Sequence, residues 1–121
     1  MKPLLKKDIS PFLKRFDSFR GSKLNSIEIV TPTTLKITLT AQDGAREFDW
    51  IIITLELSGI NDAQLPQNSK LPHIDMSEGL TIISTDTQIA FGIGNYDNFS
   101  NITNSICYIK ATSIKYEECS C

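Results

Sequence analysis

Apolar and polar residues alternate along most of the chain beyond position 21, and this period of two is typical of half-buried β-strands. The clearest example is 34–40, where Leu35, Ile37 and Leu39 alternate with threonine and lysine. The other strand-like runs are 27–29, 46–58, 80–84, 88–93 and 105–116. Because no helix-length amphipathic segment joins any two of these runs, we expect an antiparallel meander and not a parallel sheet.

The run 46–58 carries apolar residues on both faces of its predicted strand. Phe48, Trp50 and Ile52 share one parity, and further isoleucines and leucines occupy the other. Such a strand is either covered on both faces or contains a β-bulge that exchanges them. We expect a bulge at 50–53, where the sheet would curl.

The residues before position 22 predict one amphipathic helix. Ser10 is a suitable N-cap, Pro11 fits the first helical position, and Gly21 is a suitable end. Apolar residues follow at helical spacing, namely Phe12, Leu13, Phe16 and Phe19. We expect this stripe to cover one side of the sheet.

The predicted fold is therefore α+β: a short N-terminal helix packed on a curled antiparallel sheet, a half-barrel of about six strands. A length of 121 residues and a hydrophobic content of 40% suit one packed domain. We divide this single domain, 1–121, into a basic helical segment at 1–21, the β-meander at 22–117 and a short tail at 118–121.

The chain shows no sign of a membrane or secretory route. No apolar run reaches the roughly 20 residues that a membrane span needs. The first five residues contain one lysine and have no apolar stretch behind them, so we expect no secretory signal. Three cysteines, an odd number, do not suggest a disulfide framework. We expect a cytoplasmic protein that makes no membrane contact.

Charge is unevenly distributed, although the net charge is only −2. Seven of the twelve basic residues lie in the first 24 positions, whereas 37–109 holds nine acidic residues and two basic ones. An acidic body repels phosphates, which argues against nucleic-acid binding, and it suits a basic protein partner. Scattered acids that only keep a small domain soluble are the alternative interpretation.

Recognisable catalytic motifs are missing from the sequence. His73, the only histidine, lies with Asp75 and Glu78 in a loop bracketed by proline and glycine, which favours turn chemistry over a metal or acid–base site. Cys119 and Cys121 have no nearby residues in sequence that would complete a metal site. We expect no catalytic residue, no metal and no cofactor; an enzyme that uses His73 with Asp75 or Glu78 is the alternative.

Three segments resemble small bacterial domains that consist of a helix followed by a β-meander. Segment 16–29 (Phe-Asp-Ser-Phe-Arg-Gly-Ser-Lys-Leu-Asn-Ser-Ile-Glu-Ile) resembles their opening, 55–60 (Leu-Glu-Leu-Ser-Gly-Ile) a strand end, and 111–117 (Ala-Thr-Ser-Ile-Lys-Tyr-Glu) their closing strand. Several such domains are immunity proteins of contact-dependent growth inhibition and related polymorphic-toxin systems. Arg20 and Gly21 stand where that family usually has His and Asp, so no role of that pair is carried over.

The resemblance implies a cytoplasmic inhibitor that binds the C-terminal domain of a cognate toxin, in many cases a nuclease with a basic cleft. Such an inhibitor needs acidic groups and a few aromatic anchors, and two long polar loops, 61–79 and 94–104, hold most of the candidates. The expected partner-binding residues are Asp62, Asp75, Glu78, Asp86, Tyr96, Asp97 and Phe99. We expect the free protein to be a monomer.

Two other modes of action fit the same residues. A strand edge could pair with the partner in place of the loops. Alternatively, the chain could be a small-ligand-binding half-barrel, with a pocket between the phenylalanine stripe and the strand that carries Trp50. A sizeable apolar cavity there would favour ligand binding, and a filled core would count against it.

Overall fold

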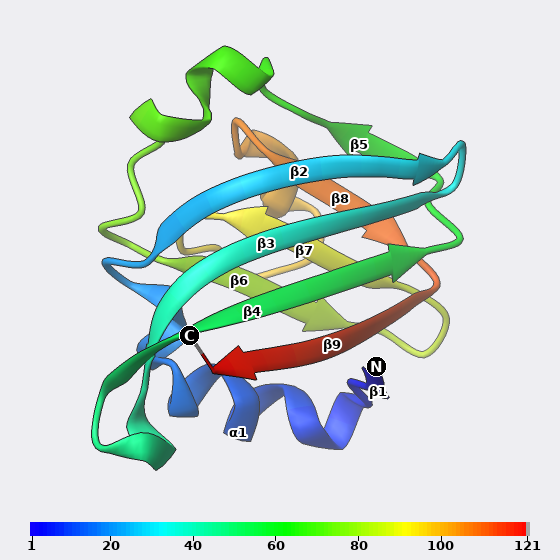
Figure 1. Cartoon of the computed structure of the whole chain (residues 1–121). Coiled ribbons are helices and arrows are strands. Elements are labelled where there is room, and N and C mark those ends of the chain that lie inside the picture. The colour runs from blue at the N-terminus through cyan, green and yellow to red at the C-terminus, as the bar shows by residue number, and fades with distance from the viewer. Residues whose placement is uncertain (121) are drawn as a thin grey trace.

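The computed structural model describes residues 1–120 and shows one α-helix with two antiparallel sheets packed face to face (Figure 1). The five-stranded sheet has the order β1 (Lys2–Pro3), β9 (Ser113–Ser120), β4 (Asp49–Ser58), β3 (Thr34–Asp43) and β2 (Lys23–Thr31). The four-stranded sheet has the order β5 (Asp62–Gln64), β8 (Tyr108–Ala111), β7 (Ile89–Ile93) and β6 (Leu80–Ser84). The predicted α+β class, a short helix on antiparallel sheet structure, is confirmed.

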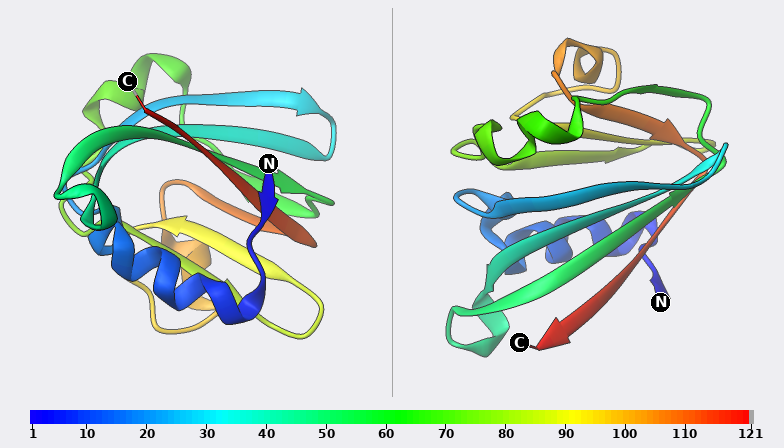
Figure 2. Two further views of the ribbon diagram at one scale, coloured as in Figure 1. Left: turned by 60° about the horizontal axis from the view of Figure 1, so that its bottom comes forward. Right: turned by 45° about the horizontal axis from the view of Figure 1, so that its top comes forward.

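Short 3-10 helices complete the connections: η1 (Asp17–Phe19), η2 (Gly44–Arg46), η3 (Asn68–His73) and η4 (Asn101–Asn104). The strands divide between two sheets because the chain crosses from one sheet to the other at a corner. The predicted strand 105–116 is in fact β8 and β9, separated at Thr112, whose amide donates to the carbonyl of Ser58 at 3.0 Å. The β4–β5 connection makes the same crossing, so the two sheets converge there like a wedge (Figure 2).

Gly59 makes this corner possible. Its φ is +69°, a left-handed conformation, and a β-carbon at this position would collide with the side chain of Thr112. The side chain of Thr112 therefore packs directly on the Gly59 backbone where the two crossing segments meet.

Helix α1 (Lys6–Arg15) covers one open side of the wedge, as expected, but its predicted bounds are wrong. It begins four residues before Ser10, so Pro11 lies inside it, and it ends at Arg15 and not near Gly21. The buried face begins at Ile9 and continues through Phe12. Burial of these apolar residues offsets the backbone hydrogen bond that a proline inside a helix cannot make.

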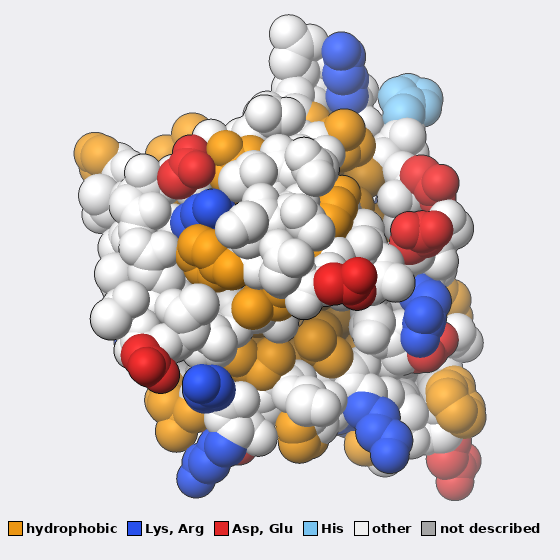
Figure 3. Space-filling view, turned by 180° about the vertical axis from the view of Figure 1, so that it is seen from behind, with side chains coloured by type: hydrophobic (Ala, Val, Ile, Leu, Met, Phe, Trp, Pro, Cys, Tyr) orange, Lys and Arg blue, Asp and Glu red, His pale blue; other side chains and the backbone are white. Residues whose placement is uncertain are grey.

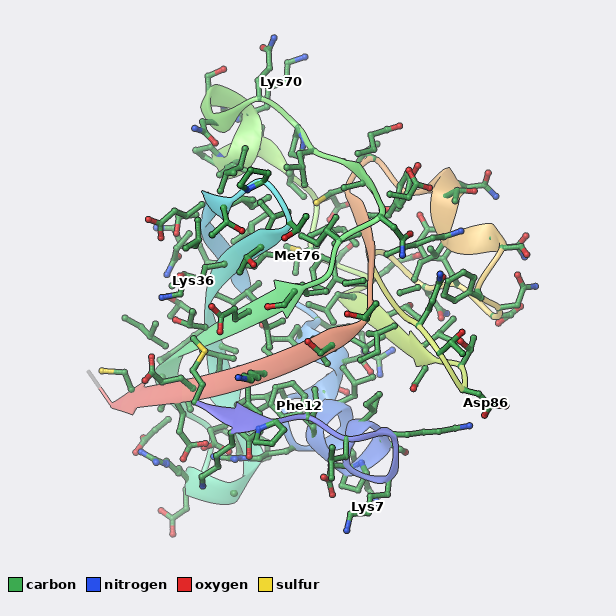
Figure 4. All side chains as sticks on the ribbon, turned by 90° about the vertical axis from the view of Figure 1, so that its right-hand side faces the viewer. Lys7, Phe12, Lys36, Lys70, Met76 and Asp86 are labelled. Carbon is green, nitrogen blue, oxygen red and sulfur yellow. The ribbon has the colours of Figure 1, made fainter. Side chains whose placement is uncertain are left out.

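Phenylalanine rings fill the space between α1 and the sheets. The ring of Phe12 lies 5.2 Å from that of Phe16, 5.7 Å from that of Phe19 and 4.9 Å from that of Tyr116, measured between centroids. Phe12 points inward from α1 toward β9 in Figure 4. The interior that the ligand-binding alternative would need open is occupied by these rings.

The expected bulge at 50–53 is wrong. The pairing of β3 with β4 runs without a shift from Thr34 opposite Ser58 to Asp43 opposite Asp49. The strand is apolar on both parities because Ile51 and the odd positions after it face the core, while Trp50 lies on the outer face and is half exposed. The register shifts occur in the edge strand β2, at Asn25 and Val30.

The outer faces of the two sheets differ. Segment 95–105 folds over the four-stranded sheet, where Ile102 is fully buried against Gly92. No described segment packs in this way on the outer face of the five-stranded sheet, which carries a row of directly opposed charges from Glu28 through Lys36 and Glu56 to Lys115. Figure 4 shows Lys36 pointing away from this face.

Candidate functional site

Unusual backbone conformations gather at one end of the molecule. All non-glycine residues described with positive φ lie there, in two groups: Asp17, Ser18 and Phe19 at +51° to +61°, and Glu47 and Phe48 at +56° and +65°. Outside glycine, such conformations cost on the order of 1–3 kcal/mol each and persist only where the surrounding structure holds them. We call this end, formed by 16–22, 43–49, 74–79 and 94–97, the loop end.

Hydrogen bonds and close packing join these segments into one surface. The amide of Gly21 donates to the carbonyl of Met76 at 2.9 Å. The amide of Gly94 donates to the carbonyl of Gly79 at 2.8 Å. A β-carbon on Gly79 would collide with the backbone of Ser18. Because both Gly79 and Gly94 also have positive φ, the loops are fixed against one another by backbone geometry.

Phe19 and Phe48 have the same strained backbone conformation, but the ring of one is buried and the ring of the other is exposed. Phe19 is completely buried and stacks on Phe16 with 4.9 Å between ring centroids, so burial of its ring compensates the strain. Phe48 is held through its backbone: its amide donates to the carbonyl of Asp43 at 2.9 Å, and its carbonyl accepts from Gln42 Nε2 at 3.3 Å. The residue is 66% exposed. The hairpin thus presents an aromatic ring to solvent.

The ring of Phe48 borders a groove of about 330 Å³ between the β3–β4 hairpin and segment 16–22. Trp50, 51% exposed, lines the same groove. Lys14 and Arg20 bring positive charge to it, although Arg20 is paired with Asp17 at 3.0 Å. We call this feature the loop-end groove; aromatic walls with cationic groups suit a mixed apolar and anionic ligand group.

A partly buried ion cluster holds the hairpin beside the helix. Arg15 Nε and Nη2 donate to the two carboxylate oxygens of Asp43 at 2.7 and 2.6 Å, and Arg15 Nη1 lies 2.9 Å from Glu118 Oε2. Arg46 Nε lies 3.3 Å from Asp43 Oδ2, and Arg46 Nη2 donates to Glu118 Oε1 at 3.0 Å. The cluster joins the end of α1 to β3, η2 and β9.

These contacts shift the acidity of the groups involved. The hydrogen bond from Arg15 lowers the pKa of the Asp43 carboxyl below its usual value, against the opposing effect of burial. The same guanidinium lowers the pKa of Glu118. The pKa of Arg15 is raised, chiefly by its hydrogen bond to Asp43. All three groups are therefore charged at neutral pH.

Four of the seven expected partner-binding residues lie at the loop end. Asp75 and Glu78 belong to one of its loops, and Tyr96 and Asp97 belong to the adjacent one. The three carboxylates are exposed, and none of the ion pairs seen among residues 1–120 includes them. The backbone amide of Ser77 donates a hydrogen bond to Asp75 Oδ1 at 2.8 Å, and this bond lowers the pKa of the Asp75 carboxyl.

The other three expected residues lie elsewhere. Asp62 accepts a hydrogen bond from the Tyr108 hydroxyl at 3.1 Å, and Lys110, directly opposite Asp62, lies 4.4 Å from the centre of the Phe99 ring. Asp86 sits at the tip of the β6–β7 hairpin, at the far end of β6 from the loop end (Figure 4). The seven residues do not form one face, and acidic side chains are also dispersed on the face seen in Figure 3.

His73 ends η3 and is exposed, two residues before Asp75 in the sequence. Within residues 1–120, no group of three or more His, Cys, Asp or Glu side chains is placed to hold a metal ion. Cys107 is buried, which raises the pKa of its thiol to about 12, and Cys119 is exposed on β9. Cys121, the last residue of the expected tail, lies outside the described residues, while 118–120 continue β9.

In comparisons with protein-family models, characterised protein sequences and solved structures, none matched this chain. Over the described residues, no helix has both the length and the apolar character that a membrane crossing requires.

Proposed function

We propose that this chain is an immunity protein, which binds the C-terminal domain of a cognate bacterial toxin and occludes its active site. The observation that carries the proposal is the loop end, where a strained hairpin exposes Phe48 beside Trp50. In the free protein, the backbone strain at Phe48 is not compensated by burial of its ring. This is consistent with a ring that becomes buried when the protein binds its partner. Aromatic residues of this kind often dominate the affinity of an interface.

Charge at the same end supports a basic partner. Asp75, Glu78 and Asp97 project from two loops that backbone bonds hold together, so their negative potentials add in one region. A toxin that acts on nucleic acid has a basic substrate cleft, and an acidic surface would be steered toward it. The proposed face thus combines an acidic part with an aromatic part, and Asp62, Asp86 and Phe99 lie outside it. Inhibition of this kind belongs in the cytoplasm, where the toxin would act.

A protection assay tests the proposal. The toxin domain would be the C-terminal domain of the large secreted protein encoded immediately upstream of this chain's gene, expressed in bacteria from an inducible promoter. Co-expression of this chain should restore growth. If growth is not restored although the chain accumulates in folded form, the proposal is wrong.

Matched variants place the binding surface. Reversal of two acids at the loop end, Glu78→Lys with Asp97→Lys, should abolish protection. The same change of charge away from the loop end, Asp86→Lys with Glu117→Lys, should leave protection intact. Equal effects of the two double variants would show that the loop end is not the binding face.

The loop-end groove favours one second candidate, the small-ligand-binding module. Its volume of about 330 Å³ lies within the range of ligand sites, and Trp50 and Phe48 provide aromatic walls. A ligand that binds there should quench or shift the fluorescence of Trp50, the single tryptophan, in the absence of any protein partner. Fluorescence titration with a library of small aromatic acids separates the two candidates.

A further inference from the structure

A second groove lies between α1 and the edge strand β6, and it shares Lys14, Asp17 and Arg20 with the loop-end groove. It has a volume of about 560 Å³. The helix contributes Lys6, Ile9, Leu13 and Lys14, and β6 contributes Ile82 and Ser84. We call it the helix–edge groove. It extends beside the one strand edge of the four-stranded sheet that adjoins α1 (Figure 1).

The backbone of β6 offers unpaired hydrogen-bonding groups to this groove. The amide of Thr85 donates to the carbonyl of Gln88 at 2.8 Å, which fixes these two residues as a hydrogen-bonded pair of the β6–β7 hairpin. Bonded and non-bonded pairs alternate along an antiparallel ladder, so Ile83 also bonds to β7 while Ile82 and Ser84 direct their N–H and C=O groups outward. No hydrogen bond described within residues 1–120 uses those outward groups.

Positive charge surrounds this free edge. Lys6, Lys14 and Arg20 line the groove with one carboxylate, Asp17, which leaves a balance of two positive charges. Asp17 is already paired with Arg20. The pair of Lys6 with Asp86, at 3.9 Å, joins two exposed side chains and contributes little. The floor is apolar, from Ile9, Leu13 and Ile82. In the lower part of Figure 3, basic side chains border exposed apolar ones.

We propose that the helix–edge groove binds an extended acidic segment of a partner protein, which adds to the four-stranded sheet as a further strand beside β6. The outward groups of Ile82 and Ser84 would pair with the backbone of the segment. Alternate residues of the segment would face the apolar floor, and acidic residues between them would meet Lys6, Lys14 and Arg20. The charge of this groove is opposite to that of the acidic loops in the proposed function, and Lys6, Ile82 and Ser84 line this groove but not the loop-end groove.

An extended peptide fits these observations better than a nucleic acid does. A free strand edge has regularly spaced donors and acceptors, which a peptide backbone matches along its length. Single-stranded nucleic acid would use aromatic stacking platforms, whereas the residues that line this groove are aliphatic, hydroxyl-bearing or charged.

The first test uses synthetic peptides and fluorescence anisotropy. The probe is a fluorescein-labelled hexapeptide, Glu-Val-Glu-Val-Glu-Val, and the control is Lys-Val-Lys-Val-Lys-Val. We expect the acidic peptide to bind at least tenfold more tightly. Two versions of the acidic peptide, N-methylated at every valine or at every glutamate, test backbone pairing, because only one of the two sets of amides faces β6. At least one version should lose tenfold in affinity.

The second test uses variants of the chain. Ser84→Pro removes the outward N–H but leaves the β6–β7 bonds, a position at which an edge strand tolerates proline, and it should weaken peptide binding at least tenfold. Ser84→Ala, which keeps the N–H, should bind within twofold of the unmodified protein. Lys6→Glu should weaken binding at least threefold, whereas Lys7→Glu, the neighbouring position outside the groove lining, should not.

Several results would overturn this proposal. One is equal binding of the acidic and basic peptides, and another is full affinity of both N-methylated versions. A third is tighter binding of a dodecathymidylate oligonucleotide that displaces the peptide, because this result would identify a nucleic-acid site. If Ser84→Pro does not fold, amide exchange of Ile82 and Ser84 in the unmodified protein decides: both should slow when the peptide binds, and unchanged exchange contradicts pairing. Toxin protection by Lys6→Glu, which weakens peptide binding, is expected to be unaffected, so the two proposals can fail separately.

Discussion

Arg15 and Asp43, 28 positions apart in the sequence, form a two-bonded ion pair that joins the last turn of α1 to the end of β3. The Asp43 side chain has no exposed surface, so its charge depends on this guanidinium and, at 3.3 Å, on Arg46. The strained hairpin that presents Phe48 begins directly after Asp43. The pair therefore determines where the exposed aromatic residues of the loop end stand.

Removal of the guanidinium should destabilise the fold strongly. Arg15→Met leaves the buried Asp43 carboxylate with Arg46 as its cationic neighbour and a hydrogen bond from the Ala45 amide. Loss of one partner of a buried pair costs about 3 kcal/mol. Urea unfolding followed by circular dichroism measures this loss. Arg20→Met, which breaks an exposed pair on the next turn, is the control and should cost less than about 1 kcal/mol. Equal losses in the free energy of unfolding for the two variants would show that the Asp43 cluster stabilises the fold no more than an exposed ion pair does.

The same cluster predicts a loss of stability in acid. The pKa values of Asp43 and Glu118 are lowered in the folded protein from ordinary values of 3.8 and 4.5. Their stabilising contribution is complete above those ordinary values and is lost as the pH falls through the lower folded-state values. Urea midpoints should therefore be level from pH 7 to pH 5 and fall below about pH 4. Glu118→Gln should reduce this fall, and an unchanged profile would contradict the assignment.

Relief of backbone strain should stabilise the hairpin. Glu47→Gly removes the side chain at a φ of +56° and is expected to raise the free energy of unfolding by about 0.5–1 kcal/mol. By contrast, Phe19→Ala loses a fully buried ring and should cost about 3–5 kcal/mol, although the same kind of conformation is involved. Thermal unfolding of both variants tests this difference in sign; a destabilised Glu47→Gly protein would mean that Glu47 carries a compensating contact.

The corner between the sheets should be intolerant of substitution at Gly59. Gly59→Ala introduces both a left-handed alanine and a collision with Thr112, and we expect a loss of more than about 2 kcal/mol. Thr112→Ala in the same chain should recover part of this loss, because the methyl group then has room. A double-mutant cycle from urea unfolding measures that coupling. If Thr112→Ala recovers no stability, the whole loss in Gly59→Ala comes from the left-handed backbone conformation and none from the collision with Thr112.

Sequence pattern was sufficient for strands whose two faces differ. The run 80–84 is β6 as observed, and 34–40 lies within β3 (Thr34–Asp43), because alternation reports directly which face is buried. Alternation does not report which sheet a strand joins. The division at Thr112 was therefore missed, although Gly59 within the Leu-Ser-Gly-Ile stretch was a signal for a sharp change of direction.

The helix bounds and the loop-end conformations also depend on tertiary packing, which the local sequence pattern does not report. Local preference predicts that the helix starts at Pro11, whereas burial of Ile9 extends the helix on the N-terminal side of Pro11, to Lys6. Nothing local predicts positive φ at Phe48, since phenylalanine avoids that region and only packing around Asp43 selects it. The acidic residues of the 74–79 and 94–97 loops were accessible to sequence reasoning because long polar loops carry charge at the surface.

The central claim is that the loop end is the binding face. Isothermal titration calorimetry with the purified toxin domain tests it most directly, comparing the unmodified chain with Phe48→Ala/Trp50→Ala. If these rings are anchors worth about 2 kcal/mol each, the double variant should bind at least 100-fold more weakly while unfolding at an unchanged urea midpoint. An affinity within threefold of the unmodified chain would contradict the claim.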